Sequence, residues 1–268
     1  MSSPSRPAPI DTLAPDVARG IEVVAFDVDD TLTTHGVLSR EAYDALWSLH
    51  DAGLALVAAT GRPYGWADVW ARLWPIDCAV AENGACWVWR EGGGVRKGYA
   101  APAENRTAQQ ATLVRISEDV LASVPSAKLA QDQPMRATDL AFDIGETQRL
   151  PRADVEAIEA IMHAHGARTL VSSVHVHAFF GEHHKGTGIL AAYEDRHGRR
   201  LDPSRVLFLG DSPNDAGAFA TFDASVGVAN VASALSRLPV APRWITSREA
   251  GLGFAEATTL LLARRRVR

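Results

Sequence analysis

The stretch Ile21-Glu22-Val23-Val24-Ala25-Phe26-Asp27-Val28-Asp29-Asp30-Thr31-Leu32-Thr33 places an apolar run directly before a group of carboxylates. The apolar residues 21–26 predict a buried strand that delivers the carboxylates to one exposed turn. Residues two apart on an extended chain project to the same side, so Asp27 and Asp29 should stand together and repel each other. A divalent cation would relieve that repulsion.

Two further apolar runs end in polar clusters. Residues 54–59 lead into Thr60-Gly61-Arg62-Pro63, and residues 206–209 lead into Gly210-Asp211-Ser212-Pro213-Asn214-Asp215. In an open parallel sheet, ligands collect at the carboxyl ends of the strands, near the switch in strand order. We therefore expect the three clusters to meet in one site.

Composition narrows the class of protein. The chain has 268 residues, of which 47% are hydrophobic and 22% charged, as in ordinary soluble proteins. The formal net charge of −5 argues against a non-specific nucleic-acid binder, which needs a basic face. Cys78 and Cys86 form neither a CxxC pair nor a disulfide-rich spacing, which favours a cytoplasmic location. Residues 1–15 lack the apolar core of a signal peptide or membrane span, and we expect a disordered tail there.

The arrangement of strands and helices predicts two domains. Strand and helix patterns alternate over residues 16–84 and again over residues 181–268, which predicts an α/β core with a parallel sheet. Residues 85–180 have a different texture, beginning with a plausible hairpin around Gly92-Gly93-Gly94 and mixing strands with helices. This middle segment is predicted to be an inserted α+β domain.

Four ordered clusters carry a family resemblance. Asp27-Val28-Asp29-Asp30-Thr31, Thr60-Gly61-Arg62, Lys185 and the run from Gly210 to Asp215 resemble the motifs of the haloacid dehalogenase-like phosphohydrolases. The junction Glu82-Asn83-Gly84-Ala85 and the long insertion further resemble the IIB branch, which includes Cof-type and sugar phosphatases with a type II cap. The resemblance implies a Rossmann-like core, a cap over residues 85–180, and a phosphatase acting on a small phosphomonoester, such as a sugar or sugar-acid phosphate.

The resemblance also implies roles for the first aspartates. Displacing an alcohol from a phosphate monoester requires an in-line nucleophile, a proton for the leaving oxygen and positive charge around the transferred group. Asp27 would attack phosphorus and form an aspartyl-phosphate. Asp29 would protonate the leaving oxygen and later take a proton from the hydrolytic water. Asp30 departs from the family pattern, in which many relatives carry Gly.

The remaining motif residues would bind the metal and the phosphate. By the resemblance, the side chains of Asp27 and Asp211 and the backbone carbonyl of Asp29 would hold Mg²⁺, with Asp215 supporting the site directly or through water. The residues expected to bind or orient the phosphate group are Thr60, the amide of Gly61, Lys185 and Asn214. Specificity for the leaving group would lie in the cap.

The sequence leaves two other functions open and disfavours a zinc site. A phosphomannomutase-like phosphotransferase would use the same chemistry but pass the phosphoryl group to another hydroxyl. A non-enzymatic sensor or scaffold would keep only the fold. A zinc cluster is disfavoured, because the chain has no His-Glu-x-x-His motif; its candidate ligands would be His163, His165, His175, His177, His183 and His184. The expected partner is a small phosphorylated metabolite, with neither nucleic acid nor membrane, and the sequence carries no signal for an oligomeric state.

Overall fold

The computed structural model describes residues 6–172 and 174–266, and its main feature is a nine-stranded sheet of order β1-β12-β11-β10-β2-β3-β4-β5-β6. In this order, all neighbouring strands from β1 to β4 pair in parallel, whereas β5 pairs antiparallel with both β4 and β6. The strands are β1 (Ala8–Pro9), β2 (Val23–Asp27), β3 (Ala55–Ala59), β4 (Cys78–Ala81), β5 (Cys86–Glu91), β6 (Gly94–Tyr99), β10 (Val206–Gly210), β11 (Ala224–Gly227) and β12 (Trp244–Ile245). The predicted α/β class with a parallel sheet is confirmed.

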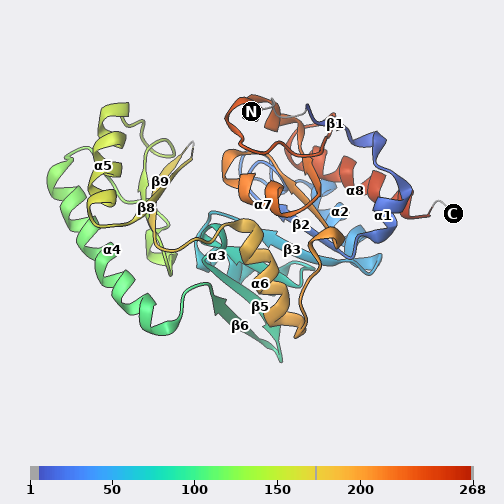
Figure 1. The fold of residues 1–268 in the computed structure, drawn as a ribbon, viewed down its shortest axis with the longest axis horizontal. Coiled ribbons are helices and arrows are strands. Elements are labelled where there is room, and N and C mark those ends of the chain that lie inside the picture. Colours follow the sequence, from blue (N-terminus) through green and yellow to red (C-terminus); the bar gives the residue numbers. More distant parts are fainter. Residues whose placement is uncertain (1–5, 173, 267–268) are drawn as a thin grey trace.

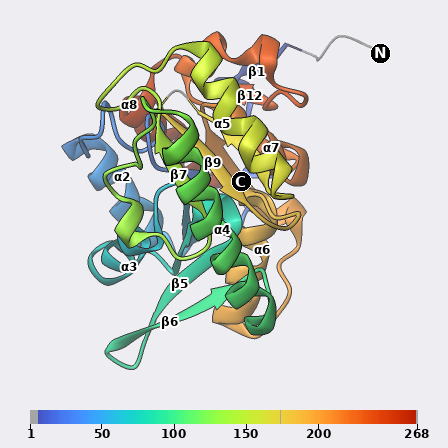
Figure 2. The same cartoon turned by 90° about the vertical axis from the view of Figure 1, so that its left-hand side faces the viewer.

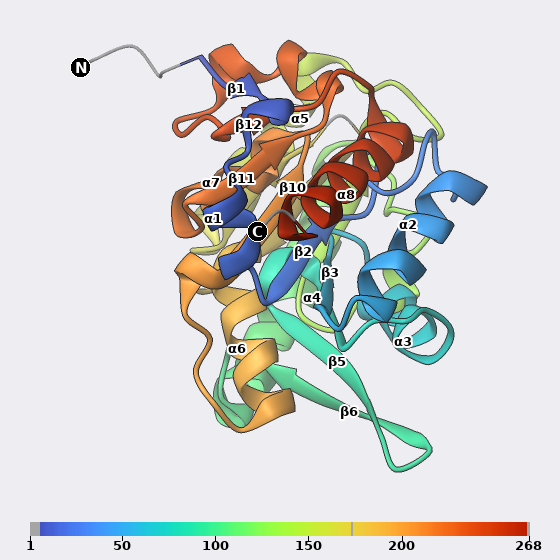
Figure 3. The ribbon, with the colours of Figure 1, turned by 90° about the vertical axis from the view of Figure 1, so that its right-hand side faces the viewer.

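Helices cover both faces of this sheet, which explains why its central strands are continuous apolar runs instead of alternating ones. Val24 and Phe26 of β2 pack in the cluster that includes helices on one face, whereas Val23 and Ala25 pack in the cluster on the other. Each fully buried valine or phenylalanine among them contributes about 1.5–3 kcal/mol. The first face carries α1 (Pro15–Gly20), α2 (Arg40–Asp51), α3 (Tyr64–Leu73) and α8 (Ala250–Arg266), and the second carries α6 (Lys185–His197) and α7 (Ala216–Thr221). Figure 3 shows α2 and α8 lying over the sheet.

Strand order reverses next to β2. From β2 the chain adds β3 and β4 on one side, and it later returns to place β10 and β11 on the other. Such a reversal leaves the carboxyl ends of β2, β3 and β10 around a crevice, where open α/β sheets bind ligands.

The middle of the chain forms a second unit with its own core. Three antiparallel strands, in the order β7-β9-β8, pack with two helices around a separate apolar cluster. The elements are α4 (Ala103–Ser123), β7 (Leu140–Asp143), α5 (Arg152–Ala164), β8 (Arg168–Val171) and β9 (His175–Phe179). Both helices lie on the far side of β8 and β9 from the main sheet (Figure 1), and Figure 2 shows α4 and α5 facing the viewer.

The hairpin predicted around Gly92-Gly93-Gly94 forms as β5 and β6, and it extends the main sheet through antiparallel pairing of β5 with β4. The division into core and cap stays a prediction. This pairing favours starting the inserted unit after Tyr99 instead of at residue 85.

The disordered tail predicted for residues 1–15 is wrong from Ala8 onward, while residues 1–5 lie outside the described part of the chain. Ala8 and Pro9 pair with β12, and Ile10 and Leu13 are buried against the sheet. A proline is tolerated here because β1 is an edge strand. Among the described residues, no helix is both long and apolar enough to cross a membrane.

Candidate active site

The motif clusters meet at the carboxyl ends of β2, β3 and β10. Lys185 is fully buried as the first residue of α6, and its Nζ lies 2.7 Å from Asp27 Oδ1 and 2.7 Å from Asp215 Oδ1. The same ammonium donates to Asn214 Oδ1 at 3.2 Å. Burial would lower the pKa of Lys185, but the Asp215 and Asp27 carboxylates raise it above its ordinary value. The lysine is therefore a fixed positive charge between two motifs.

Three carboxylates gather beside this lysine. Asp27, Asp211 and Asp215 each offer an oxygen, and these oxygens all lie within 4.8 Å of one another. Burial and the neighbouring carboxylates raise the pKa of Asp27 well above its usual range, although the positive charge of Lys185 acts to lower it. Burial and Asp215 raise the pKa of Asp211 to about 7. Clustered carboxylates of this kind suit a hard divalent cation such as Mg²⁺, which prefers oxygen ligands.

The three carboxylates are not equivalent. Both oxygens of Asp215 already accept hydrogen bonds, Oδ1 from Lys185 and Oδ2 from the backbone amides of Asp211 and Ser212. Asp211 accepts one bond at each oxygen, from Thr31 at 3.1 Å and from Asn230 at 2.8 Å. Asp215 is fully buried and accepts three hydrogen bonds, whereas Asp211 is partly exposed and lines the cavity with Asp27. These differences support Asp27 and Asp211 as direct ligands and Asp215 as the residue that positions Lys185 and the loop.

Asp27 and Asp29 line the same cavity but have different cationic partners. Arg62 holds Asp29, with Nε 3.1 Å from Oδ1 and 3.2 Å from Oδ2. Thr60 Oγ1 lies 3.4 Å from Asp29 Oδ2 and accepts the backbone amide of Arg62 at 2.9 Å. Repulsion between the two aspartates is therefore relieved by separate cations, Lys185 for one and Arg62 for the other.

The residues predicted to bind phosphate lie around the same crevice. Gly61 and Asn214 line the cavity with Asp27 and Asp29, while Thr60 and Lys185 are buried and contact these aspartates. A Cβ at Gly61 would lie 3.2 Å from the side-chain amide of Asn83, which would have to move by a few tenths of an ångström to make room. The structure thus brings all the predicted site residues together, and their roles stay predictions.

Asp30 occupies a position where glycine would be the easy choice. Its φ of 53° is in the left-handed region, which asparagine and aspartate tolerate better than other residues with a side chain. Its side chain accepts the backbone amide of His35 at 3.0 Å, and its carbonyl accepts Asn230 Nδ2 at 3.0 Å. The departure from the family pattern is therefore accommodated by local hydrogen bonds.

Glu82, which follows β4, is a buried carboxylate whose contacts sequence reasoning missed. It accepts the amides of Tyr64 at 2.9 Å, Ala137 at 2.8 Å and Thr138 at 2.6 Å, besides the Thr138 hydroxyl and the Asp139 amide. Burial and the nearby Asp139 raise the pKa of Glu82 to about 7. The Glu82-Asn83-Gly84 junction thus joins the main sheet to the loop before β7. No local sequence pattern predicts this contact.

The inserted unit forms one wall of the active-site cavity, which has a volume of about 390 Å³. Glu146, Ser172, His175 and His177 contribute to this wall. Sequence reasoning gave no role to Glu146, because it lies in a loop and its partner Arg62 is distant in the chain.

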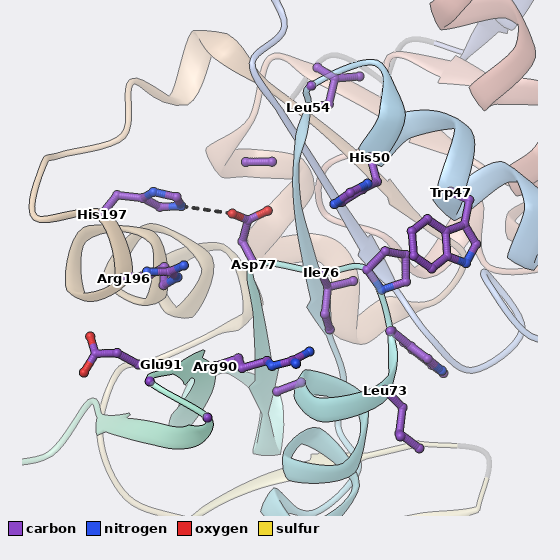
Figure 4. A pocket seen from close by; sticks show the side chains of 17 residues that line it. Trp47, His50, Leu54, Leu73, Ile76, Asp77, Arg90, Glu91, Arg196 and His197 are labelled. Atoms are coloured by element: carbon purple, nitrogen blue, oxygen red, sulfur yellow. Dashed lines mark ion pairs between the residues drawn. The ribbon is translucent and has the colours of Figure 1, made fainter.

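A larger cavity of about 780 Å³ lies at the opposite end of the strands. Asp77, Arg90, Arg196 and His197 surround it in Figure 4, where a dashed line marks the ion pair of 3.4 Å between His197 and Asp77. Its lining begins where β3 and β4 begin, and it includes none of the motif residues. Size alone therefore does not identify the reactive site.

Comparisons with known proteins agree with the motifs. A family model described as haloacid dehalogenase-like hydrolase matches residues 24–101. Two curated relatives are named phosphoglycolate phosphatase. The one from Methanoculleus marisnigri is 25% identical, with 88% of this chain and 95% of the relative covered. The one from Pyrobaculum neutrophilum is 29% identical, with 91% of this chain and 97% of the relative covered.

Solved structures extend the likeness to the inserted unit. A Thermoplasma acidophilum protein superposes with a TM-score of 0.69 at 16% identity, covering 90% of this chain and 98% of that one. The C-terminal domain of the C. albicans trehalose-6-phosphate phosphatase superposes with a TM-score of 0.68 at 14% identity, covering 98% of this chain and 99% of that one. At these identities the likeness establishes a shared fold.

Proposed function

We propose that this chain, an enzyme of the phosphatase type that is similar to the haloacid dehalogenase-like hydrolases, hydrolyses a small phosphomonoester with Mg²⁺ through an aspartyl-phosphate on Asp27. The observation that carries the proposal is the buried contact of Asp27 with Lys185, beside the carboxylates of Asp211 and Asp215. A nucleophile, a cation and an oxygen-rich metal site are thus assembled from motifs distant in sequence.

Asp27 and Asp211 would hold the metal with the backbone carbonyl of Asp29, and Asp215 would support them. The fit rests on carboxylate oxygens that lie within 4.8 Å of one another. When bound, Mg²⁺ supplies positive charge that offsets the repulsion between the Asp27 carboxylate and the phosphate oxygens.

The side chains of the chain itself would carry the remaining steps. Asp27 attacks phosphorus, and Lys185 stabilises the negative charge that shifts onto the transferred group. Removing one such preorganised donor commonly costs about 2.7–4 kcal/mol in the barrier. Thr60, Gly61 and Asn214 would bind or orient the phosphate oxygens.

Asp29 would act as acid and then as base. Its side chain faces the cavity, and Arg62 fixes its orientation through contacts to both carboxylate oxygens. Asp29 would give a proton to the departing alcohol and then take one from the water that cleaves the aspartyl-phosphate.

The proposed substrate is a small phosphorylated metabolite, a sugar or sugar-acid phosphate. A cavity of about 390 Å³ supports a substrate of that size. The names of the relatives, phosphoglycolate phosphatase and trehalose-6-phosphate phosphatase, support phosphate esters of both kinds. Two buried free cysteines fit the proposed cytoplasmic location.

Phosphate release from a panel of phosphomonoesters tests the proposal. The purified protein should release inorganic phosphate with Mg²⁺, and both chelation of the metal and Asp27→Asn should stop the release. Isomerisation of a sugar phosphate without phosphate release would instead support the phosphomannomutase-like alternative. Failure to act on any ester of the panel would overturn the proposed function.

A further inference from the structure

The wall that the inserted unit gives to the active-site cavity has an unusual charge pattern. Glu146 Oε2 lies 3.0 Å from His175 Nε2, and Glu146 Oε1 lies 3.1 Å from Arg62 Nη1. Arg62 in turn contacts Asp29, the proposed acid and base. A continuous series of polar contacts therefore runs from β9 to the reacting centre.

We propose that Glu146, positioned by His175, selects the leaving group, admitting an uncharged, hydroxyl-bearing alcohol and rejecting one that carries a carboxylate. This inference rests on the proposed function and narrows its substrate class from sugar or sugar-acid phosphates to phosphorylated sugars and polyols.

The wall formed by the inserted unit is negatively charged. Its described lining residues include no lysine or arginine, and they are Glu146, Leu170, Ser172, Val174, His175 and His177. Burial would raise the pKa of Glu146, but the hydrogen bond and positive charge of Arg62 lower it, so the carboxylate is ionised near neutral pH. Burial and His177 lower the pKa of His175, which leaves its imidazole neutral. A leaving group therefore meets a negative wall.

The nearby cations, Arg62 and Lys185, are already paired with carboxylates of the protein. Arg62 lies between three carboxylates, with contacts of 3.1 Å to Asp29, 3.1 Å to Glu146 and 3.7 Å to Asp132. Lys185 is buried between Asp27 and Asp215. A carboxylate on the substrate would have to displace one of these partners, and its juxtaposition with Glu146 would cost binding energy.

A substrate hydroxyl would gain a hydrogen bond to Glu146. Carboxylate oxygens only accept hydrogen bonds, and each has capacity for more than one donor. A substrate hydroxyl can donate to Glu146 without leaving a buried charge unpaired. Sites built to bind a hydroxyl discriminate strongly, because unpaired polar groups are expensive when buried.

Matched substrate pairs test the inference directly. The pairs are 2-hydroxyethyl phosphate with phosphoglycolate, and glycerol 3-phosphate with 3-phosphoglycerate, which differ only in a CH₂OH group replacing a carboxylate. We expect kcat/KM at least tenfold higher for the alcohol of each pair. Equal values, or a preference for the carboxylates, would overturn the selectivity while leaving the phosphatase function intact. No phosphate release from any ester would overturn both.

A charge-removing variant identifies the residue responsible. Glu146→Gln keeps the shape of the side chain but removes its charge, so the ratio of kcat/KM values within each pair should narrow at least tenfold relative to the parent. Glu156→Gln is the matched control, since Glu156 is an exposed residue of α5 that pairs with Arg152. The control should retain the ratio of the parent. A ratio in Glu146→Gln equal to that of the parent would refute the role of Glu146.

Discussion

Lys185 Nζ lies 2.7 Å from Asp27 Oδ1, and both side chains are almost fully buried at the carboxyl end of β2. A buried ion pair is weakly stabilising on its own, since desolvation offsets much of the attraction. Its position here, next to two further carboxylates, makes it more useful for chemistry than for stability.

Asp27→Asn should reduce turnover by on the order of 10³-fold or more, because the amide cannot serve as the nucleophile. The shape of the side chain is retained, so the fold should persist, as circular dichroism would show. Asp30→Asn is a suitable control, because Asp30 is exposed and can keep its local hydrogen bonds. Substantial phosphate release by Asp27→Asn would refute the nucleophile assignment.

Lys185→Met should lower the free energy of unfolding by about 3–5 kcal/mol, because it leaves buried Asp27 and Asp215 carboxylates without their cation. Turnover should fall as well. Urea denaturation of the variant measures the stability change, with Lys97→Met at an exposed position as the control. If both variants unfolded alike, the buried charge at residue 185 would not have the importance assigned to it.

Asp211→Asn should raise the Mg²⁺ concentration needed for half-maximal activity at least tenfold, since it removes a charged ligand. Asp215→Asn should act differently and chiefly lower the free energy of unfolding, because Asp215 is fully buried and accepts three hydrogen bonds, one of them from the Lys185 ammonium. Magnesium titrations and urea denaturation of the two variants separate these effects. Identical behaviour of the variants would contradict the division of roles.

Glu82 should make stability depend on pH. Its pKa is raised from 4.5 to about 7, so its contribution is fully present below pH 4.5 and is lost as the pH rises toward 7. Burial would raise the pKa of the neighbouring Asp139, but Arg136 and His177 lower it to about 2. Asp139 therefore stays ionised in this window.

Between pH 4.5 and 7.5, the unfolding free energy of the parent should therefore fall by up to about 3 kcal/mol relative to that of Glu82→Gln. Urea denaturation at a series of pH values measures the difference. Glu91→Gln, at an exposed site on β5, should follow the parent. Parallel profiles for the parent and Glu82→Gln would rule out this titration.

The sequence was sufficient to predict the family, the α/β class and an enzyme of the phosphatase type, all of which are confirmed. The reason is that these properties depend on local signals. An apolar run followed by Asp27 and Asp29 is both a buried strand and a motif, and the same holds for the runs before Thr60 and Asp211. The match to the family model and the likeness to two phosphatases also argue against the scaffold alternative.

Other features were decided only by tertiary packing. Ala8 and Pro9 form a strand because β12, far along the chain, offers an edge, and β5 joins the main sheet because β4 lies beside it. Arg62 meets Glu146, and Glu82 meets the loop before β7, for the same reason. Contacts between residues distant in sequence carry no periodic or compositional signal, so only the folded chain brings such partners together.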